Sequence, residues 1–75
     1  MDIVIENSGD DITLVVEDRN NRSTVVFSGR LNRRARSTIQ VTADSDNRAS
    51  IFVKIDNGPD TPYDRIREGE TVRVN

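Results

Sequence analysis

The chain has 75 residues, of which 11 are Lys or Arg and 13 are Asp or Glu, and its formal net charge at pH 7 is −2. It contains no His, no Cys and no Trp, which excludes disulfides, Cys/His zinc sites and catalysis by a His base or a Cys nucleophile. The acidic balance disfavours a nucleic-acid-binding module, because such modules are usually basic. The length is that of one domain, residues 1–75, and no apolar run approaches the roughly 20 residues of a membrane-spanning helix.

Short runs rich in Val, Ile and Thr alternate with clusters of Asn, Asp, Gly, Ser and Pro along the whole chain. Alternation of apolar and polar residues is typical of half-buried strands, and the polar clusters are typical of turns. The pattern predicts seven strands, at Asp2–Glu6, Ile12–Glu17, Ser23–Ser28, Ser37–Ala43, Ala49–Ile55, Tyr63–Arg67 and Thr71–Val74. Strands of this length with frequent turns indicate an all-β fold without helices, a small antiparallel β-sandwich or barrel.

Residue parity within these strands predicts which side chains face the core, because successive side chains of a strand point to opposite faces. The predicted core consists of Ile5, Ile12, Leu14, Val16, Val26, Ile39, Val41, Ile51, Val53, Ile66 and Val72. Leu31 is expected to act as a single anchor that dips into this core after the third strand. Residues 56–62 hold both prolines and are expected to form the longest loop.

The segment Phe27-Ser28-Gly29-Arg30-Leu31-Asn32-Arg33-Arg34-Ala35-Arg36-Ser37-Thr38-Ile39-Gln40-Val41 resembles a recurring piece of bacterial immunoglobulin-like modules. In those modules a strand ends in Gly, a Leu anchors the next turn, and a strand rich in Ser and Thr returns. The chain departs from that pattern at Arg33-Arg34, where the modules usually carry Pro-Gly. The resemblance covers about a fifth of the chain. It implies an immunoglobulin-like sandwich and implies no activity.

Pairs of carboxylates are the remaining candidates for acid/base hydrolysis, and they are Asp10-Asp11, Asp44 with Asp46, and Asp56 with Asp60. All three pairs lie in predicted turns, where Asp is expected because its side chain bonds nearby backbone amides. A sandwich of this size also offers little depth for a cleft that would raise a carboxylate pKa. We therefore expect no enzymatic activity, and a carboxylate-only hydrolase is the least favoured alternative.

The run Asp44-Ser45-Asp46-Asn47 is similar to the start of an oxygen-ligand calcium loop. An EF-hand is excluded, because its required Gly and Glu positions are occupied by Ala49 and Ile55. A simpler calcium site with Asp44 and Asp46 as ligands stays open beside the plain β-turn. This run and the acidic residues at 56–60 together support an alternative function, a carbohydrate- or calcium-binding module.

The order of charges along the chain is its one unusual feature. Residues 1–18 carry six acidic residues and no base, whereas residues 19–36 carry six arginines and no acid. Two interpretations stay open. The two blocks form ion pairs within the chain, or the arginines meet the acidic block of a second copy or another anionic partner, for which Arg is suited by its planar, bidentate guanidinium.

Under the intermolecular interpretation, the candidate partner-binding residues are Arg30, Arg33, Arg34, Arg36 and the out-facing Phe52. In a self-associating chain these arginines are expected to meet Asp10, Asp11, Glu17 or Asp18 of another copy. The favoured function is thus a non-catalytic interaction module that binds a protein, or its own copy, through charged loops and a sheet edge. No cofactor is expected.

Overall fold

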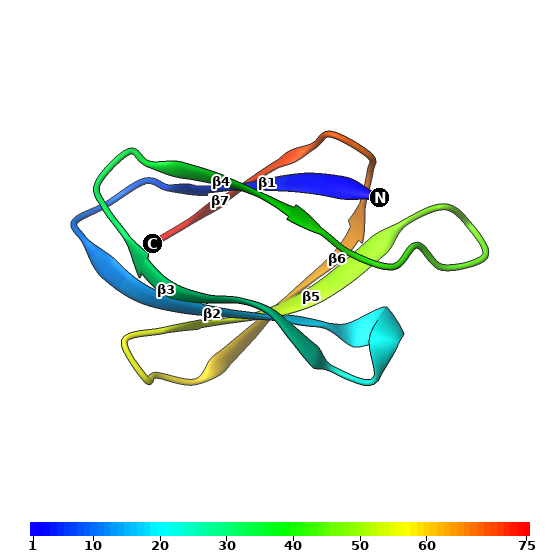
Figure 1. Cartoon of the computed structure of the whole chain (residues 1–75), viewed down its shortest axis with the longest axis horizontal. Coiled ribbons are helices and arrows are strands. Elements are labelled where there is room, and N and C mark those ends of the chain that lie inside the picture. Colours follow the sequence, from blue (N-terminus) through cyan, green and yellow to red (C-terminus); the bar gives the residue numbers. More distant parts are fainter.

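The computed structural model describes residues 1–75 and contains seven strands, one 3₁₀ turn (η1, Arg19–Asn21) and no α-helix. The strands are β1 (Asp2–Asn7), β2 (Ile12–Asp18), β3 (Thr24–Leu31), β4 (Arg36–Gln40), β5 (Ala49–Ile55), β6 (Asp60–Ile66) and β7 (Thr71–Val74). They form a three-stranded sheet in the order β4-β1-β7 and a four-stranded sheet in the order β3-β2-β5-β6. The two sheets face each other as the layers of a sandwich, which confirms the predicted fold class (Figure 1). A helix able to cross a membrane is absent.

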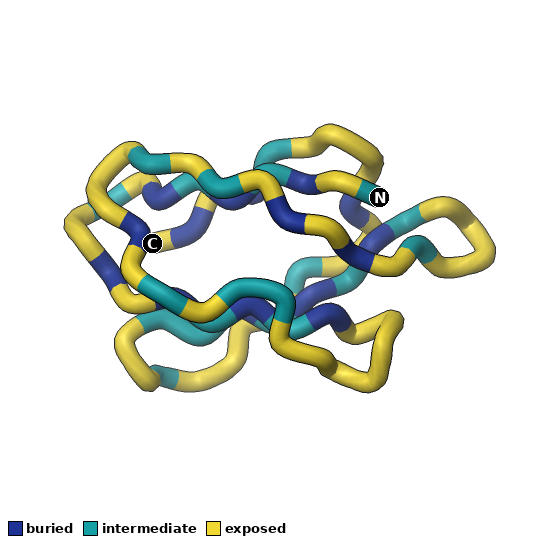
Figure 2. The backbone as a smooth tube through the Cα atoms, in the orientation of Figure 1, coloured by how far each residue is buried: buried dark blue, intermediate teal, exposed yellow.

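The core lies between the two layers and is a single cluster of 14 buried apolar residues (Figure 2). Of the predicted core, every residue except Val26 is buried, and the anchoring role of Leu31 is confirmed. The remaining members of the cluster are Ile3, Ala49 and Val74. Both sheets therefore bury the inward side of their alternating strands, and the polar residues between them point outward.

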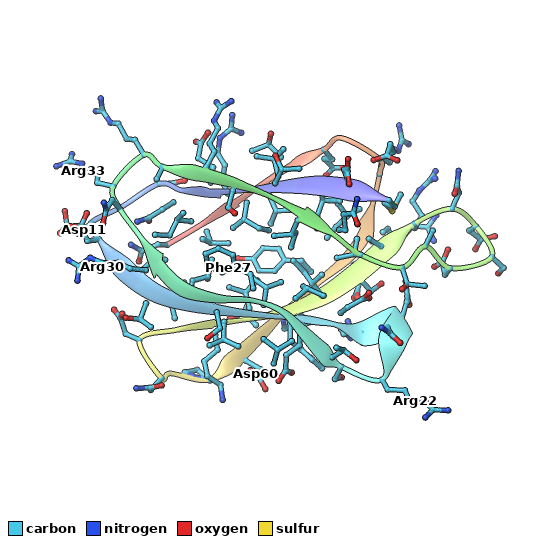
Figure 3. All side chains as sticks on the ribbon, in the orientation of Figure 1. Asp11, Arg22, Phe27, Arg30, Arg33 and Asp60 are labelled. Carbon is cyan, nitrogen blue, oxygen red and sulfur yellow. The ribbon has the colours of Figure 1, made fainter.

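Val26 is the exception because β3 contains a bulge. Val16 pairs with Phe27 and Glu17 pairs with Val25, so that Val26 has no partner on β2. One extra residue in a strand reverses which side chains face the core beyond it. Phe27 consequently takes the inward position, packs against the core and lies between the two sheets (Figure 3). Val26 is half-buried at the bulge and still packs against the core, so its predicted burial is confirmed only in part.

One strand pair departs from the expected antiparallel pairing, since β7 runs parallel to β1. β6 belongs to the four-stranded sheet, and the chain crosses to the other sheet in the turn between β6 and β7. Gly69 takes a φ of 75° in this turn, and its N–H donates to the carbonyl of Asp2 at 2.7 Å. The chain therefore enters β7 beside the start of β1 and continues in the same direction.

The sixth strand begins earlier than predicted, at Asp60, so that it includes Pro62. β6 is an edge strand, where a proline without an N–H is tolerated. A second bulge, with Arg65 at a φ of 57°, lies in its pairing with β5. The third strand likewise extends to Leu31, and the fourth ends at Gln40.

Candidate functional site

A shallow polar pocket of about 450 Å³ lies on the outer side of the three-stranded sheet. Its lining contains no hydrophobic residue and consists of Glu6, Asn7, Ser8, Arg34, Arg36 and Arg73. We call this site the arginine pocket. Three guanidinium groups against one carboxylate give its lining a net charge of +2. It is the one pocket that the structure contains.

The register of the three-stranded sheet builds the floor of the arginine pocket. Glu6 on β1 lies opposite Arg36 on β4 and opposite Arg73 on β7, so that the three form one row across the sheet. Arg36 Nε lies 2.7 Å from Glu6 Oε1, and Arg73 Nε lies 3.3 Å from Glu6 Oε2. Each oxygen of the carboxylate is thus held by a different arginine.

The side chain of Glu6 is 17% exposed, whereas those of Arg36 and Arg73 are 64% and 69% exposed. The hydrogen bond from Arg36 holds the pKa of Glu6 below its ordinary value; partial burial opposes this, and the charges of the two arginines add to the lowering. Glu6 is therefore a stable anion at neutral pH. The two exposed guanidinium groups keep further donors for an incoming anion, because each carries five N–H groups.

Arg34 lines the arginine pocket from the turn between β3 and β4. Its φ is 63°, and its backbone N–H donates to the carbonyl of Asn7 at 2.9 Å. Ala35 closes the same turn by donating to Asn32 O at 2.9 Å. Arg34 is exposed and forms no ion pair within the chain. It is the arginine of the pocket whose charge no carboxylate neutralises.

Asn7 lies beneath the arginine pocket and is fully buried. Its Nδ2 donates to Asp10 O at 2.8 Å and to Leu31 O at 2.9 Å, and its Oδ1 accepts from Gly9 N at 3.0 Å. Asn75 Nδ2 donates to the same Oδ1 at 3.3 Å. One side chain thus joins the end of β1 to the next turn, to the end of β3 and to the chain end after β7, which fixes the pocket wall.

The charge blocks meet within the chain. Arg30 pairs with Asp11 at 3.3 Å, and Arg33 pairs with Asp10 at 4.0 Å, at one end of the molecule (Figure 3). The N–H of Arg33 also donates to Asp11 Oδ1 at 2.7 Å. This backbone hydrogen bond and the side chain of Arg30 hold the pKa of Asp11 below its ordinary value. These contacts and the pairing of Arg36 with Glu6 agree with the intramolecular interpretation, in which the two charge blocks form ion pairs within the chain.

Two residues that the intermolecular interpretation placed at the interface, Asp18 and Phe52, lie away from the candidate partner-binding arginines in the structure. Asp18 is 1% exposed, and its Oδ2 accepts from Thr42 N at 2.7 Å, so the expectation that it meets an arginine of another copy is wrong. Phe52 is half-buried on the outer side of the four-stranded sheet, on the opposite layer from Arg36. The guanidinium of Arg19 lies 4.6 Å from its ring centroid. Phe52 is therefore covered by its own chain and is remote from the arginine pocket.

Asp44, the first calcium-ligand candidate, forms hydrogen bonds within its own β-turn. Its Oδ1 accepts from Asp46 N at 2.8 Å and from Arg48 N at 3.0 Å. No group of three or more His, Cys, Asp or Glu side chains comes together in the structure. The carboxylate of Asp44 is thus used in the way expected of an Asp at the start of a β-turn.

Sequence reasoning missed Arg73 and Glu6 as members of the site. Alternation in Thr71–Val74 places Arg73 on the outer side of its strand, which is a usable signal. Nothing in the sequence shows that β7 lies beside β1, because this pairing joins residues 67 positions apart. No family model, no curated protein and no solved structure matches this chain.

Proposed function

We propose that this chain is a non-catalytic interaction module that binds an acidic segment of a protein through the arginine pocket. The observation that carries the proposal is the excess of three arginines over one carboxylate in a pocket that no hydrophobic residue lines. Arg pairs with carboxylates through two parallel N–H donors, which adds geometric specificity to the charge attraction. Arg34 supplies a guanidinium that forms no ion pair within the chain and is free to meet a partner's carboxylate.

The chemistry of Glu6 supports binding rather than catalysis. A general acid near neutral pH needs a raised carboxyl pKa, whereas both arginines favour the ionised form of Glu6. The polar lining also argues against a small organic ligand, since such sites are mostly apolar. A carboxylate-rich protein segment fits both properties. Immunoglobulin-like modules remain the architectural resemblance, and the proposal does not depend on it.

The test is a titration with a fluorescent, glutamate-rich peptide, comparing Arg34→Ala with Arg22→Ala. The two arginines are matched, since both are exposed, form no ion pair and have left-handed φ values of 63° and 55°. Arg22 lies far from the pocket, at the opposite end from Arg33 (Figure 3). We expect Arg34→Ala to weaken binding by about tenfold, as loss of one charge-assisted contact does, and Arg22→Ala to leave it within about twofold. Equal effects of the two variants would overturn the proposal.

A further inference from the structure

The outer side of the three-stranded sheet has two oppositely charged ends. Across β4, β1 and β7, the row of Arg36, Glu6 and Arg73 lies at one end of this face. The middle row consists of Thr38, Val4 and Thr71. Asp2 lies at the other end, beside Gln40. Asp2 and Glu6 are four positions apart on β1, which corresponds to about 13 Å along a strand.

The end that contains Asp2 is acidic because the turn between β6 and β7 adds two glutamates. Glu68 Oε2 accepts from Asp2 N at 2.6 Å, and Val4 N donates to Glu70 O at 2.9 Å, so that both residues lie against the start of β1. Asp2, Glu68 and Glu70 are all exposed, and none forms an ion pair. Arg67 is the one basic side chain of this turn. These four side chains carry a net charge of −2, and the amino group of Met1, which donates to Val41 O at 3.1 Å, brings the charge of this end to −1.

We propose that the acidic segment bound by the arginine pocket is the Asp2/Glu68/Glu70 end of a second copy of this chain. Two copies lie with the outer sides of their three-stranded sheets face to face and with their β1 strands antiparallel. A twofold axis then passes near Val4, which is equally far along β1 from Asp2 and from Glu6. The arginine pocket of each copy faces the acidic end of the other, as the isologous contact of a twofold dimer requires.

Charge selects this orientation over its alternative. With β1 strands parallel, the two arginine pockets would face each other, and juxtaposed like charges strongly disfavour association. The small residues of the middle row allow the sheets to approach, and the long Arg and Glu side chains span the roughly 10 Å between stacked sheets. This dimer rests on the proposed function, because it names the partner of the same pocket.

The charges on the outer side of the four-stranded sheet are arranged differently. On the four-stranded sheet, Arg19 pairs with Asp64, and Lys54 lies directly opposite Asp60 in the strand register. The edge strand β6 is blocked against strand addition by Pro62 and by the bulge at Arg65. The outer side of the three-stranded sheet carries arginines at one end and carboxylates at the other, and its charges are thus self-complementary.

The proposed dimer is weak and salt-sensitive. β1, β4 and β7 have six, five and four residues and lie about 4.8 Å apart, so that together they cover roughly 240 Å², whereas stable interfaces bury about 800 Å² per partner. Sedimentation should therefore show dimers at protein concentrations near 1 mM in about 20 mM salt. They should be lost in about 0.5 M salt, where the screening length falls to a few ångströms.

Exchange of the charges at both ends tests the pairing directly. The first variant, Arg34→Glu with Arg73→Glu, turns the arginine pocket acidic, and the second, Asp2→Arg with Glu70→Arg, turns the acidic end basic. Each alone should dimerise at least about tenfold more weakly, because like charges then meet in both contacts. An equimolar mixture should recover association to within a few-fold of the native chain, because both contacts are again between opposite charges.

The control for net charge is Arg22→Glu with Arg65→Glu, which alters the total charge by the same amount as the first variant does. Both control arginines are exposed, form no ion pair and have left-handed φ values. This variant should associate with the Asp2→Arg, Glu70→Arg chain more weakly than the first variant does, because one of its two contacts then joins like charges; equal association of the two would show attraction by net charge alone and overturn the dimer. Amide spectra confirm that each variant is folded, and the salt series on the native chain does not depend on any variant.

Two further outcomes separate this inference from the proposed function. A native chain that stays monomeric at 1 mM in low salt, yet binds the glutamate-rich peptide through Arg34, overturns the dimer and leaves the function standing. A dimer that persists unchanged in 0.5 M salt also overturns it, because the contact then lies elsewhere. Loss of both peptide binding and self-association overturns both.

Discussion

The outer sides of the two sheets arrange their charges differently. On the three-stranded sheet, Glu6 is shared by Arg36 and Arg73, and the carboxylates of Asp2 and its neighbouring turn lie about four residues away with no cation paired to them. On the four-stranded sheet, Arg19 pairs with Asp64, and Lys54 lies opposite Asp60 in the strand register. Alternation within strands determines which residues face outward on both sheets. The strand register determines which outward charges become neighbours, and on the three-stranded sheet it places Arg36 and Arg73 at one end and Asp2 at the other.

A buried polar residue ends the first strand of each sheet. Asn7 ends β1 and Asp18 ends β2, and both are almost fully buried. Asn7 bonds four partners from three segments, whereas Asp18 Oδ1 and Oδ2 accept from Asn20 N and Thr42 N. Each therefore holds loops to its sheet by hydrogen bonds that water cannot easily replace. Asn7 lies under the arginine pocket, so its role in stability and its role in the site coincide.

The largest expected effect is that of Asn7→Ala. It should lower the free energy of unfolding by about 2–4 kcal/mol, because the carbonyls of Asp10 and Leu31 and the N–H of Gly9 lose their buried partner. Urea denaturation measures this loss. The control is Asn32→Ala, at an exposed residue whose side chain accepts only from Arg30, with an expected change within about 0.5 kcal/mol. A loss below about 1 kcal/mol for Asn7→Ala would show that the wall of the pocket does not depend on this residue.

The next effect concerns the apolar layer beneath the four-stranded sheet. Val53 is 1% exposed and Val25 is 51% exposed, although both are strand valines of the same sheet. Val53→Ala should lower the free energy of unfolding by about 1–3 kcal/mol, through lost apolar burial and the cavity that remains. Val25→Ala should change it by less than about 0.5 kcal/mol. The same denaturation curves decide this, and equal losses at both positions would contradict the strand register.

The smallest expected effect is on the pH dependence of stability, through Glu6 on the three-stranded sheet. The folded-state pKa of Glu6 is lowered from an ordinary value of 4.5, so its stabilising contribution is fully present above about pH 4.5. This contribution is lost as the pH falls through the lower, folded-state pKa. Glu6→Gln should therefore reduce the loss of stability between pH 7 and pH 3. In an Arg36→Gln background the same substitution should matter less, since Arg36 is the main cause of the shift; an unchanged acid response of Glu6→Gln would contradict the assignment.

Much of the fold could be predicted from single strands. The runs at Ile12–Glu17 and Ala49–Ile55 alternate cleanly, so that the burial of Leu14, Ile51 and Val53 followed from parity alone. Prediction was only partly right at Val26, which lies half-buried at a bulge, and it failed at Pro62, which lies within an edge strand. A bulge depends on the partner strand, and an edge position depends on the order of the strands. Neither property belongs to the residue's own sequence neighbourhood.

The sequence by itself determined the order of charges along the chain, but only the tertiary structure decided which charged residues come together in the site. The separation of acids in residues 1–18 from arginines in residues 19–36 is a property of the chain. Which of these charges neutralise one another depends on pairings such as that of Glu6 with Arg36 and Arg73, which join three distant strands. Any strand register that keeps the apolar side chains inward satisfies hydrophobic burial. The order of charges along the chain is compatible with several of these registers and does not select one. The parallel pairing of β7 with β1, set by the crossing between the sheets, brought Arg73 to the arginine pocket and the glutamates to the opposite end of the same face.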